Sequence, residues 1–164
     1  MSSATLQDSI HLDSKPSSRA PVLEDRGRPL VMGVVNITPD SFSDGGRWLQ
    51  PDQAVARAET LMAEGADMLD LGAESTRPGG GTYGRGAVSV PIEEELRRLL
   101  PVLSALRRTL TIPISVDTRK AEVARAALAA GADLINDISA LGDPEMANVV
   151  ARAGCPIVLM HSRG

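Results

Sequence analysis

Residues 65–71, Gly-Ala-Asp-Met-Leu-Asp-Leu, and residues 131–137, Gly-Ala-Asp-Leu-Ile-Asn-Asp, are two copies of one pattern. In each copy, a glycine of the kind that caps the carboxyl end of a helix precedes a short apolar run typical of a buried strand. A helix, a capping glycine and a buried strand together form the repeating unit of a parallel α/β sheet. The repeat therefore predicts alternating helices and parallel strands.

The same alternation extends over most of the chain. Apolar runs predict strands at residues 31–36, 68–73, 113–117, 134–138 and 157–161. Apolar residues at helical spacing predict helices after Pro51, over 92–110, over 120–130 and over about 144–153. Pro101 lies inside the second helix and is expected to kink or split it. Strands that are apolar at nearly every position indicate a sheet covered on both faces, as in a barrel or a doubly wound sheet.

Composition sets the limits of this interpretation. The chain has 164 residues, of which 43% are hydrophobic, enough for one domain with its own core. Residues 1–28 contain six serines without sustained periodicity, which predicts a flexible N-terminal arm before a domain at 29–164. A net charge of -4 argues against nucleic acid or an anionic membrane as a partner. Cys155 is the only cysteine, which excludes an intrachain disulfide and favours the cytoplasm.

Polar residues lie near the carboxyl end of every predicted strand. They are Asn36, Asp70 with Glu74, Asp117, Asn136 with Asp137, and His161. Any one of them could serve only to cap a helix or to bind loop backbone. Five strands that end in this way on the same side of a sheet are hard to explain by capping alone. That side binds ligands in parallel α/β folds, so the pattern predicts a binding site there.

Four longer motifs follow these strands in order. They are NITPDSFSDGG (36–46), GAESTRPGGG (72–81), SVDTRK (115–120) and LINDIS (134–139), with LMHSRG (159–164) after them. Over residues 29–164 the set closely resembles the N-terminal part of the bacterial dihydropteroate synthase family, the sulfonamide-inhibited transferases of folate biosynthesis. The resemblance implies a (β/α)₈ TIM barrel of the pterin-binding type, truncated here after the fifth strand. Such a barrel takes about 250 residues.

The resemblance also implies a reaction. The family condenses 6-hydroxymethyl-7,8-dihydropterin diphosphate with p-aminobenzoate to 7,8-dihydropteroate and releases diphosphate, with Mg²⁺. A hard cation with oxygen ligands stabilises the negative charge that builds on the leaving diphosphate. Asn36 matches the family's metal ligand. Because its amide oxygen is neutral, diphosphate oxygens and waters must complete the coordination shell.

The family's binding positions match further residues. Asp117 and Asn136 match the pterin-binding positions, where a carboxylate accepts two N–H groups and an amide offers a donor and an acceptor. Thr76 matches a threonine that contacts diphosphate. Asp70 and Glu74 are alternatives for the electrostatics of the site, with a supporting role expected.

Two loops carry the remaining candidates. Asp44 and Phe42 match the first loop, where the family uses an acid to order the closed site and an aromatic ring against the aminobenzoate. Arg77 and Pro78 match the loop that shapes the aminobenzoate site, although Arg77 could equally be a solvent-facing arginine. The resemblance thus implies catalytic roles for Asp44 and Arg77, and substrate-binding roles for Phe42 and Pro78.

The chain departs from the family in one respect. The family's later motifs, Asp-Pro-Gly-Phe-Gly, Ser-Arg-Lys and Arg-x-His, do not occur in the sequence. We therefore expect an incomplete fragment that does not catalyse the reaction alone. Two alternatives stay open: a pterin-dependent methyltetrahydrofolate methyltransferase with a related barrel, and a non-catalytic pterin-binding remnant. The family forms homodimers, but that interface is not assignable on this part of the chain.

Overall fold

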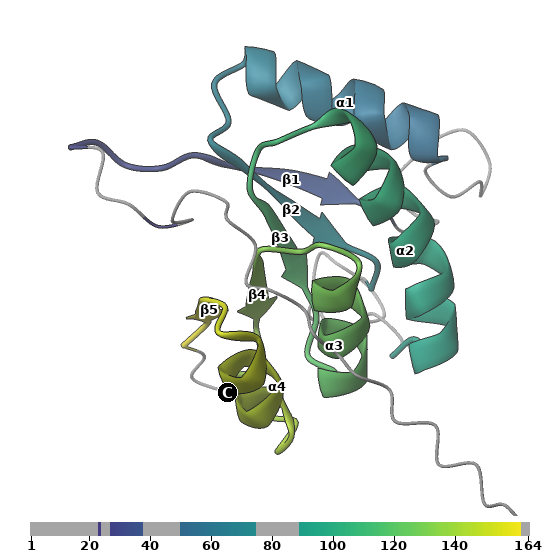
Figure 1. Ribbon diagram of the computed structural model, residues 1–164, viewed down its shortest axis with the longest axis vertical. Coiled ribbons are helices and arrows are strands. Elements are labelled where there is room, and N and C mark those ends of the chain that lie inside the picture. Colours follow the sequence, from purple (N-terminus) through teal and green to yellow (C-terminus); the bar gives the residue numbers. More distant parts are fainter. Residues whose placement is uncertain (1–22, 24–26, 38–49, 75–88, 162–164) are drawn as a thin grey trace, which may run out of the picture.

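The computed structural model describes residue 23 and residues 27–37, 50–74 and 89–161. Its elements alternate along the chain as β1 (Met32–Asn36), α1 (Pro51–Ala63), β2 (Met68–Gly72), α2 (Ile92–Thr109), β3 (Ile114–Asp117), α3 (Ala121–Ala129), β4 (Leu134–Asp137), α4 (Met146–Ala153) and β5 (Ile157–Leu159) (Figure 1). The strands are parallel and lie in one five-stranded sheet in the order of the sequence. The predicted alternation is confirmed. The predicted N-terminal arm lies almost entirely outside the described residues.

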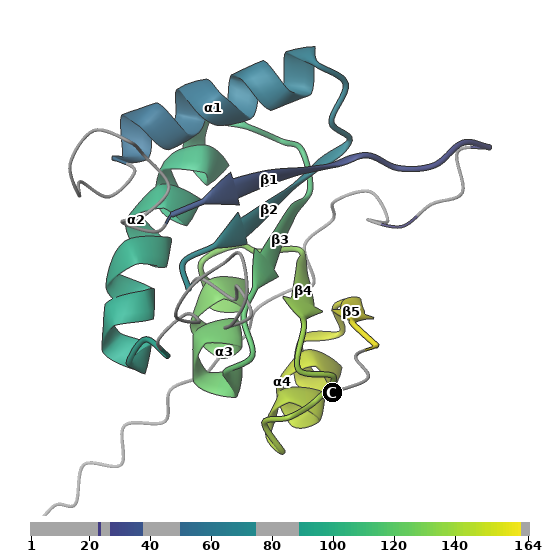
Figure 2. The same ribbon diagram turned by 180° about the vertical axis from the view of Figure 1, so that it is seen from behind.

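The helices form one layer along one side of the sheet, each beside the next in chain order (Figures 1 and 2). Strand β1 shows which face they cover, because Gly33 and Val35 are buried while Val34 and Asn36 are exposed. A Cβ atom on Gly33 would lie 3.1 Å from Cδ1 of Leu61, so α1 packs directly on this glycine. The opposite face, which carries Val34 and Asn36, is called the inner face below.

The prediction that both faces are covered holds for the middle of the sheet and is wrong at its sides. Every residue of β2 is buried. On the inner face of the outer strands, Val34 is 50% exposed and Val158 is 37% exposed. The physical reason is that a single helix layer covers only one face, and among the described residues nothing packs over the inner face of β1 and β5.

The core lies between the sheet and the helix layer. Its largest fully buried side chains include Leu69, Leu71, Leu99, Leu103, Leu106, Ile114 and Ile135. Each such side chain contributes about 1.5–3 kcal/mol when it leaves water. Helix α2 supplies several of them and continues through Pro101 as one helix, so of the two predicted effects, a kink or a split, the split does not occur. Pro101 is exposed, and the hydrogen bond that its ring cannot donate therefore lies on the solvent side of the helix.

The two Gly-Ala-Asp repeats build the same hydrogen-bonded ring at the amino ends of the strands. The backbone N–H of Asp67 donates to the carbonyl of Val31 (2.8 Å), and the Asp67 carboxylate accepts the N–H of Val31 (2.9 Å). Asp133 and Ile114 exchange the same two bonds, each 2.8 Å long. The first ring joins the start of β2 to the chain entering β1, and the second joins the start of β4 to β3. The repeat in the sequence is therefore a repeat in structure.

An arginine completes each ring, and the two arginines differ in burial. Arg28 pairs with Asp67 and its side chain is 53% exposed, whereas Arg107 pairs with Asp133 and is 8% exposed. We expect Asp133→Asn to lower the free energy of unfolding by about 3 kcal/mol, because it leaves a buried guanidinium without its carboxylate. The matched variant Asp67→Asn should lose clearly less, because water solvates Arg28.

Urea denaturation of both variants, with the unmodified chain alongside, measures these losses. Equal losses from the two variants would contradict the view that burial of the arginine decides the strength of the ring.

Candidate functional site

Asn36, Gly72, Asp117 and Asn136 lie side by side in four neighbouring strands. Asn36 is in register with Gly72, Gly72 with Asp117, and Asp117 with Asn136. Residues in register on parallel strands point to the same face, which here is the inner face. All four lie at the carboxyl ends of their strands, and together they are called the polar row. The structure thus brings together the three candidate site residues that it describes.

Gly72 leaves a gap in the polar row. A Cβ atom at this position would lie 3.7 Å from both Oδ1 of Asn36 and Oδ2 of Asp117. These are ordinary van der Waals distances, so a methyl group would fit without strain. The missing side chain instead keeps open a space that is lined by oxygen atoms on two sides. A ligand group in this space would contact Asn36 and Asp117 together.

Asp117 is the titratable group of the polar row, and its pKa is strongly perturbed. It is half-buried, and burial together with the negative charges of Asp70, Glu95, Glu74 and Asp137 raises its pKa to about 7. A carboxyl group with such a pKa changes between acceptor and donor near neutral pH. Perturbed groups of this kind are concentrated at functional sites.

Asp70 lies on the inner face, one step below the polar row. It is in register with Val34 and Ser115 and is 4% exposed. Its Oδ2 atom accepts a hydrogen bond of 3.0 Å from Nδ2 of Asn136. Within the described part of the chain, Oδ1 of Asp70 and Oγ of Ser115 are buried without a hydrogen-bond partner. Asp70 therefore contacts the polar row through one hydrogen bond, which it accepts from Asn136.

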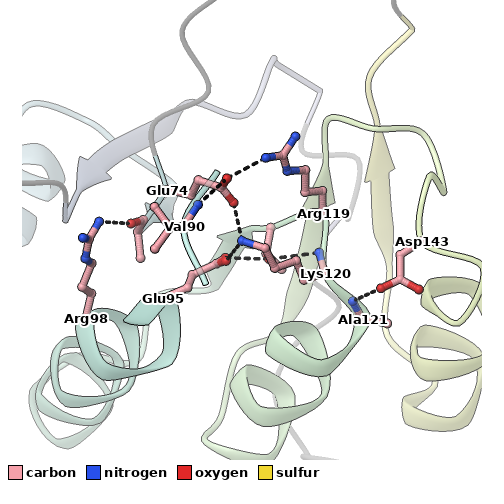
Figure 3. A network of polar contacts seen from close by, with 10 residues as sticks. Glu74, Val90, Glu95, Arg98, Arg119, Lys120, Ala121 and Asp143 are labelled. Atoms are coloured by element: carbon pink, nitrogen blue, oxygen red, sulfur yellow. Dashed lines mark hydrogen bonds and ion pairs between the residues drawn. The ribbon is translucent and has the colours of Figure 1, made fainter. Parts of the chain in front are cut away.

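A network of charged residues lies beside the polar row, between the ends of β2 and β3 and the starts of α2 and α3 (Figure 3). The Glu74 carboxylate accepts hydrogen bonds from Arg119 (2.6 Å), from Lys120 (2.6 Å) and from the backbone N–H of Val90 (3.2 Å). Burial pushes the pKa of Glu74 upward, but these bonds outweigh burial and hold the pKa below its ordinary value. Glu74 is thus a charged anchor for neighbouring elements.

Glu95 extends the network into the core. It is 0% exposed and accepts hydrogen bonds from Lys120 (2.5 Å) and from the hydroxyl of Thr118 (2.7 Å). Glu95 lies in the first turn of α2. A buried carboxylate in this position needs a cation, and Lys120 supplies it.

Five candidates, Phe42, Asp44, Thr76, Arg77 and Pro78, lie outside the described residues. The structure does show how the chain on either side of the segment 75–88 is held. Glu74 precedes it, Val90 follows it closely, and the two residues are joined by the hydrogen bond within the network. The roles of the five candidates stay predictions.

The structure gives none of three further residues, Asp137, Cys155 and His161, a direct part in the site. Asp137 is 0% exposed and accepts bonds from the N–H and hydroxyl of Ser139 and the N–H of Leu141, so it shapes the loop after β4. Burial raises the pKa of the Cys155 thiol, which disfavours the reactive thiolate. His161 is exposed, and no contact with another described residue gives it a role.

The part of the chain that the structure describes contains no group of three or more His, Cys, Asp or Glu residues that could hold a metal ion. Asn36 is exposed, and its Oδ1 borders the gap at Gly72. A single neutral oxygen suits a hard cation whose other ligands come from the substrate and water.

Across the described ranges, none of the helices is both long and apolar enough to cross a membrane.

Sequence reasoning missed two parts of this site. Gly72 was not a candidate, because a glycine at a strand end reads as a turn residue until its neighbours in the sheet are known. Lys120 was also missed, although one signal was available: Glu95 falls on the apolar side of its helix and so requires a buried cation.

The raised pKa of Asp117 predicts the pH dependence of stability. The folded pKa of about 7 exceeds the ordinary value of 3.8, so the folded chain holds a proton that the unfolded chain has lost. The contribution of Asp117 to stability is therefore present at low pH and is lost as pH rises towards 7. We expect Asp117→Asn, which stays neutral, to gain stability relative to the unmodified chain between about pH 5 and about pH 8. Urea denaturation at both pH values measures the difference, and a difference that does not change with pH would contradict the raised pKa.

The chain resembles known proteins over most of its length. A family model described as pterin binding enzyme matches residues 32–164. The chain is 44% identical over 164 residues to the dihydropteroate synthase of Bacillus subtilis. The aligned region covers 99% of this chain and 54% of that protein.

Two solved structures show the same fold. The dihydropteroate synthase of Xanthomonas albilineans with 4-aminobenzoic acid has a TM-score of 0.73 and 54% identity, over 83% of this chain and 48% of that one. The enzyme of Burkholderia cenocepacia complexed with 7,8-dihydropteroate has a TM-score of 0.69 and 47% identity, over 85% of this chain and 43% of that one. The likeness to dihydropteroate synthases and the barrel type of the fold are thus confirmed.

The chain spans about half the length of these three proteins. Because the family model covers most of the chain, and the polar row lies at the sheet edge where parallel α/β folds bind ligands, the chain belongs to the family of pterin binding enzymes.

Proposed function

We propose that this chain serves the dihydropteroate synthase reaction, in which it binds the pterin diphosphate substrate. The observation that supports this most directly is the polar row, which sets a carboxylate and an amide in register on neighbouring strands. The relatives that the chain matches over most of its length are named as dihydropteroate synthases, and two were solved with 4-aminobenzoic acid or 7,8-dihydropteroate.

The chemistry of the pterin ring suits these side chains. The ring edge presents adjacent N–H groups and a carbonyl oxygen. Ionised Asp117 accepts two N–H groups, and the carbonyl oxygen of the Asn136 amide offers a further acceptor beside it. Because Asp117 is half-buried, its hydrogen bonds to a ligand are stronger than they would be in water.

In the proposed reaction, the amine nitrogen of p-aminobenzoate attacks the methylene carbon next to the pterin ring. A carbon–nitrogen bond forms, the carbon–oxygen bond to diphosphate breaks, the amine loses a proton, and diphosphate leaves with the bonding electrons. The part of this chain is to hold the pterin ring so that the methylene carbon faces the amine. Asp117 and Asn136 orient the ring for that step.

Asn36 is the proposed ligand for Mg²⁺. It stands in the polar row across the gap at Gly72 from Asp117, so a metal-bound diphosphate and a bound pterin would be neighbours. When bound, Mg²⁺ supplies positive charge that offsets the charge of the leaving diphosphate.

Other expectations from the sequence stay predictions. They include a cytoplasmic location, which the single cysteine supports, and absence of turnover by the chain alone. Open edges at β1 and β5 in the described sheet support the last of these, because a sheet that is not closed holds site residues less rigidly. The homodimer of the family stays unassigned on this part of the chain. The methyltransferase alternative has weaker support, because the compared relatives are named as synthases.

Isothermal titration calorimetry with 6-hydroxymethyl-7,8-dihydropterin diphosphate and Mg²⁺ tests the proposal. We expect Asp117→Asn to weaken binding about ten- to a hundredfold, because a charge-assisted hydrogen bond to the ring is lost. The calorimetric titration is carried out at about pH 8, above the pKa of Asp117, so that the carboxylate is ionised.

The control is Asp52→Asn, the same chemical change at an exposed position in the first turn of α1. It should leave the affinity unchanged. Equal affinities for the unmodified chain and a folded Asp117→Asn variant would refute the binding role of Asp117.

A second variant tests the gap in the polar row. Gly72→Ala places a methyl group 3.7 Å from the oxygens of Asn36 and Asp117, a distance at which nothing clashes. We therefore expect the free energy of unfolding to stay within about 1 kcal/mol of the unmodified value, since alanine also restricts the unfolded chain. Binding of the pterin diphosphate should nevertheless weaken about tenfold or more, because the methyl group occupies the space between the two side chains. Loss of stability in step with affinity would show that Gly72 serves the fold alone.

A further inference from the structure

The amide of Asn136 has its orientation set by a buried carboxylate. Its side chain lies 3.0 Å from Oδ2 of Asp70, which belongs to a strand two places away in the sheet. A carboxylate only accepts hydrogen bonds, so the amide atom that faces Asp70 is the nitrogen. The carbonyl oxygen and the second N–H of the amide are then directed elsewhere.

Asp70 itself is held in place. It is 4% exposed and lies in register between Val34 and Ser115 on the neighbouring strands. A side chain in such surroundings has few alternative rotamers. The Asp70 carboxylate therefore determines the orientation of the Asn136 amide, and the amide does not determine the orientation of the carboxylate.

The bonding of Asp70 differs from that of the structural carboxylates. Both oxygens of Asp137 accept hydrogen bonds from its own loop. Asp70, by contrast, has one hydrogen bond, to Asn136, and in the described part of the chain its Oδ1 is buried without a partner. A buried carboxylate with so few partners costs stability. Its benefit must therefore lie in something other than folding.

We propose that Asp70 is a positioning residue that sets the specificity of the polar row. By holding Nδ2 of Asn136, Asp70 commits the amide carbonyl to the ligand, so that Asn136 and Asp117 present acceptors together. The row then prefers a ring with adjacent N–H groups over a ring with a carbonyl oxygen at the same place. This inference rests on the proposed function and deepens it.

The matching ligand class is the 2-amino-4-oxo pterins. The 2-amino group and the adjacent N3–H of the ring supply N–H donors to a row of acceptors. In a lumazine, the 2-amino group is replaced by a carbonyl oxygen, which faces the acceptors and leaves them unpaired. Sites built on such hydrogen bonds discriminate strongly against an analogue that lacks the donor.

The first experiment tests the geometry without a ligand. The sequence contains three asparagines, Asn36, Asn136 and Asn148, so selective ¹⁵N labelling gives three side-chain amide signals. We expect the Asn136 amide protons to exchange with water about tenfold more slowly than those of Asn148, which is exposed on α4. Equal exchange in the unmodified chain would overturn the proposal, whether or not any variant folds.

The second experiment measures specificity by calorimetry with 6-hydroxymethylpterin and 6-hydroxymethyllumazine. In Asp70→Asn the new amide can face Asn136 in either orientation. We expect the preference for pterin over lumazine to fall about tenfold. Two controls should keep the preference: Ser115→Ala, which removes the neighbouring buried hydroxyl, and Asp52→Asn, the same chemical change at an exposed position of α1.

The outcomes separate the two proposals. A folded Asp70→Asn chain that keeps the full preference for pterin would overturn the role of Asp70 while leaving the proposed function intact. Failure of the unmodified chain to bind either compound would refute the proposed function, and with it the specificity role. Loss of preference in Asp70→Asn alone supports both.

Discussion

The parallel register of the strands is the constraint on which the rest of the structure depends. Side chains alternate between the two faces of a strand, so a slip of one residue would exchange Asp117 for Val116 on the inner face. The carboxylates of Asp67 and Asp133 oppose such a slip, because each bonds the backbone of the neighbouring strand segment. Bonds at the amino ends of the strands thus determine which residues form the polar row at the carboxyl ends.

Carboxylates at the two ends of the sheet differ in how their negative charge is neutralised. At the amino end, Asp133 is neutralised by a buried arginine and holds backbone in place. At the carboxyl end, Asp70 has one described hydrogen bond, and Asp117 has a pKa raised to about 7. Such a contrast is typical of barrel folds, in which one end provides stability and the other provides chemistry.

The charged network beside the site explains why Asp117 keeps its raised pKa. Two cations, Arg119 and Lys120, follow Asp117 closely in the chain, yet both bind Glu74, and Lys120 also binds Glu95 (Figure 3). Among the described residues, none of the ion pairs includes Asp117. The polar row therefore presents acceptors in a negative environment, which suits a ligand edge rich in N–H groups.

The sequence by itself determined the alternation of helices and strands, because a capping glycine followed by an apolar run is a local pattern. It also indicated Asn36, Asp117 and Asn136 as candidate site residues, through motifs that stand at strand ends, and the structure brings these three together. Tertiary structure alone decided the contacts between distant segments. The bond from Asn136 to Asp70 joins residues 66 positions apart, and the openness of the inner face depends on which elements cover it. Such features follow from which strands are neighbours in space, and local periodicity carries no information about that.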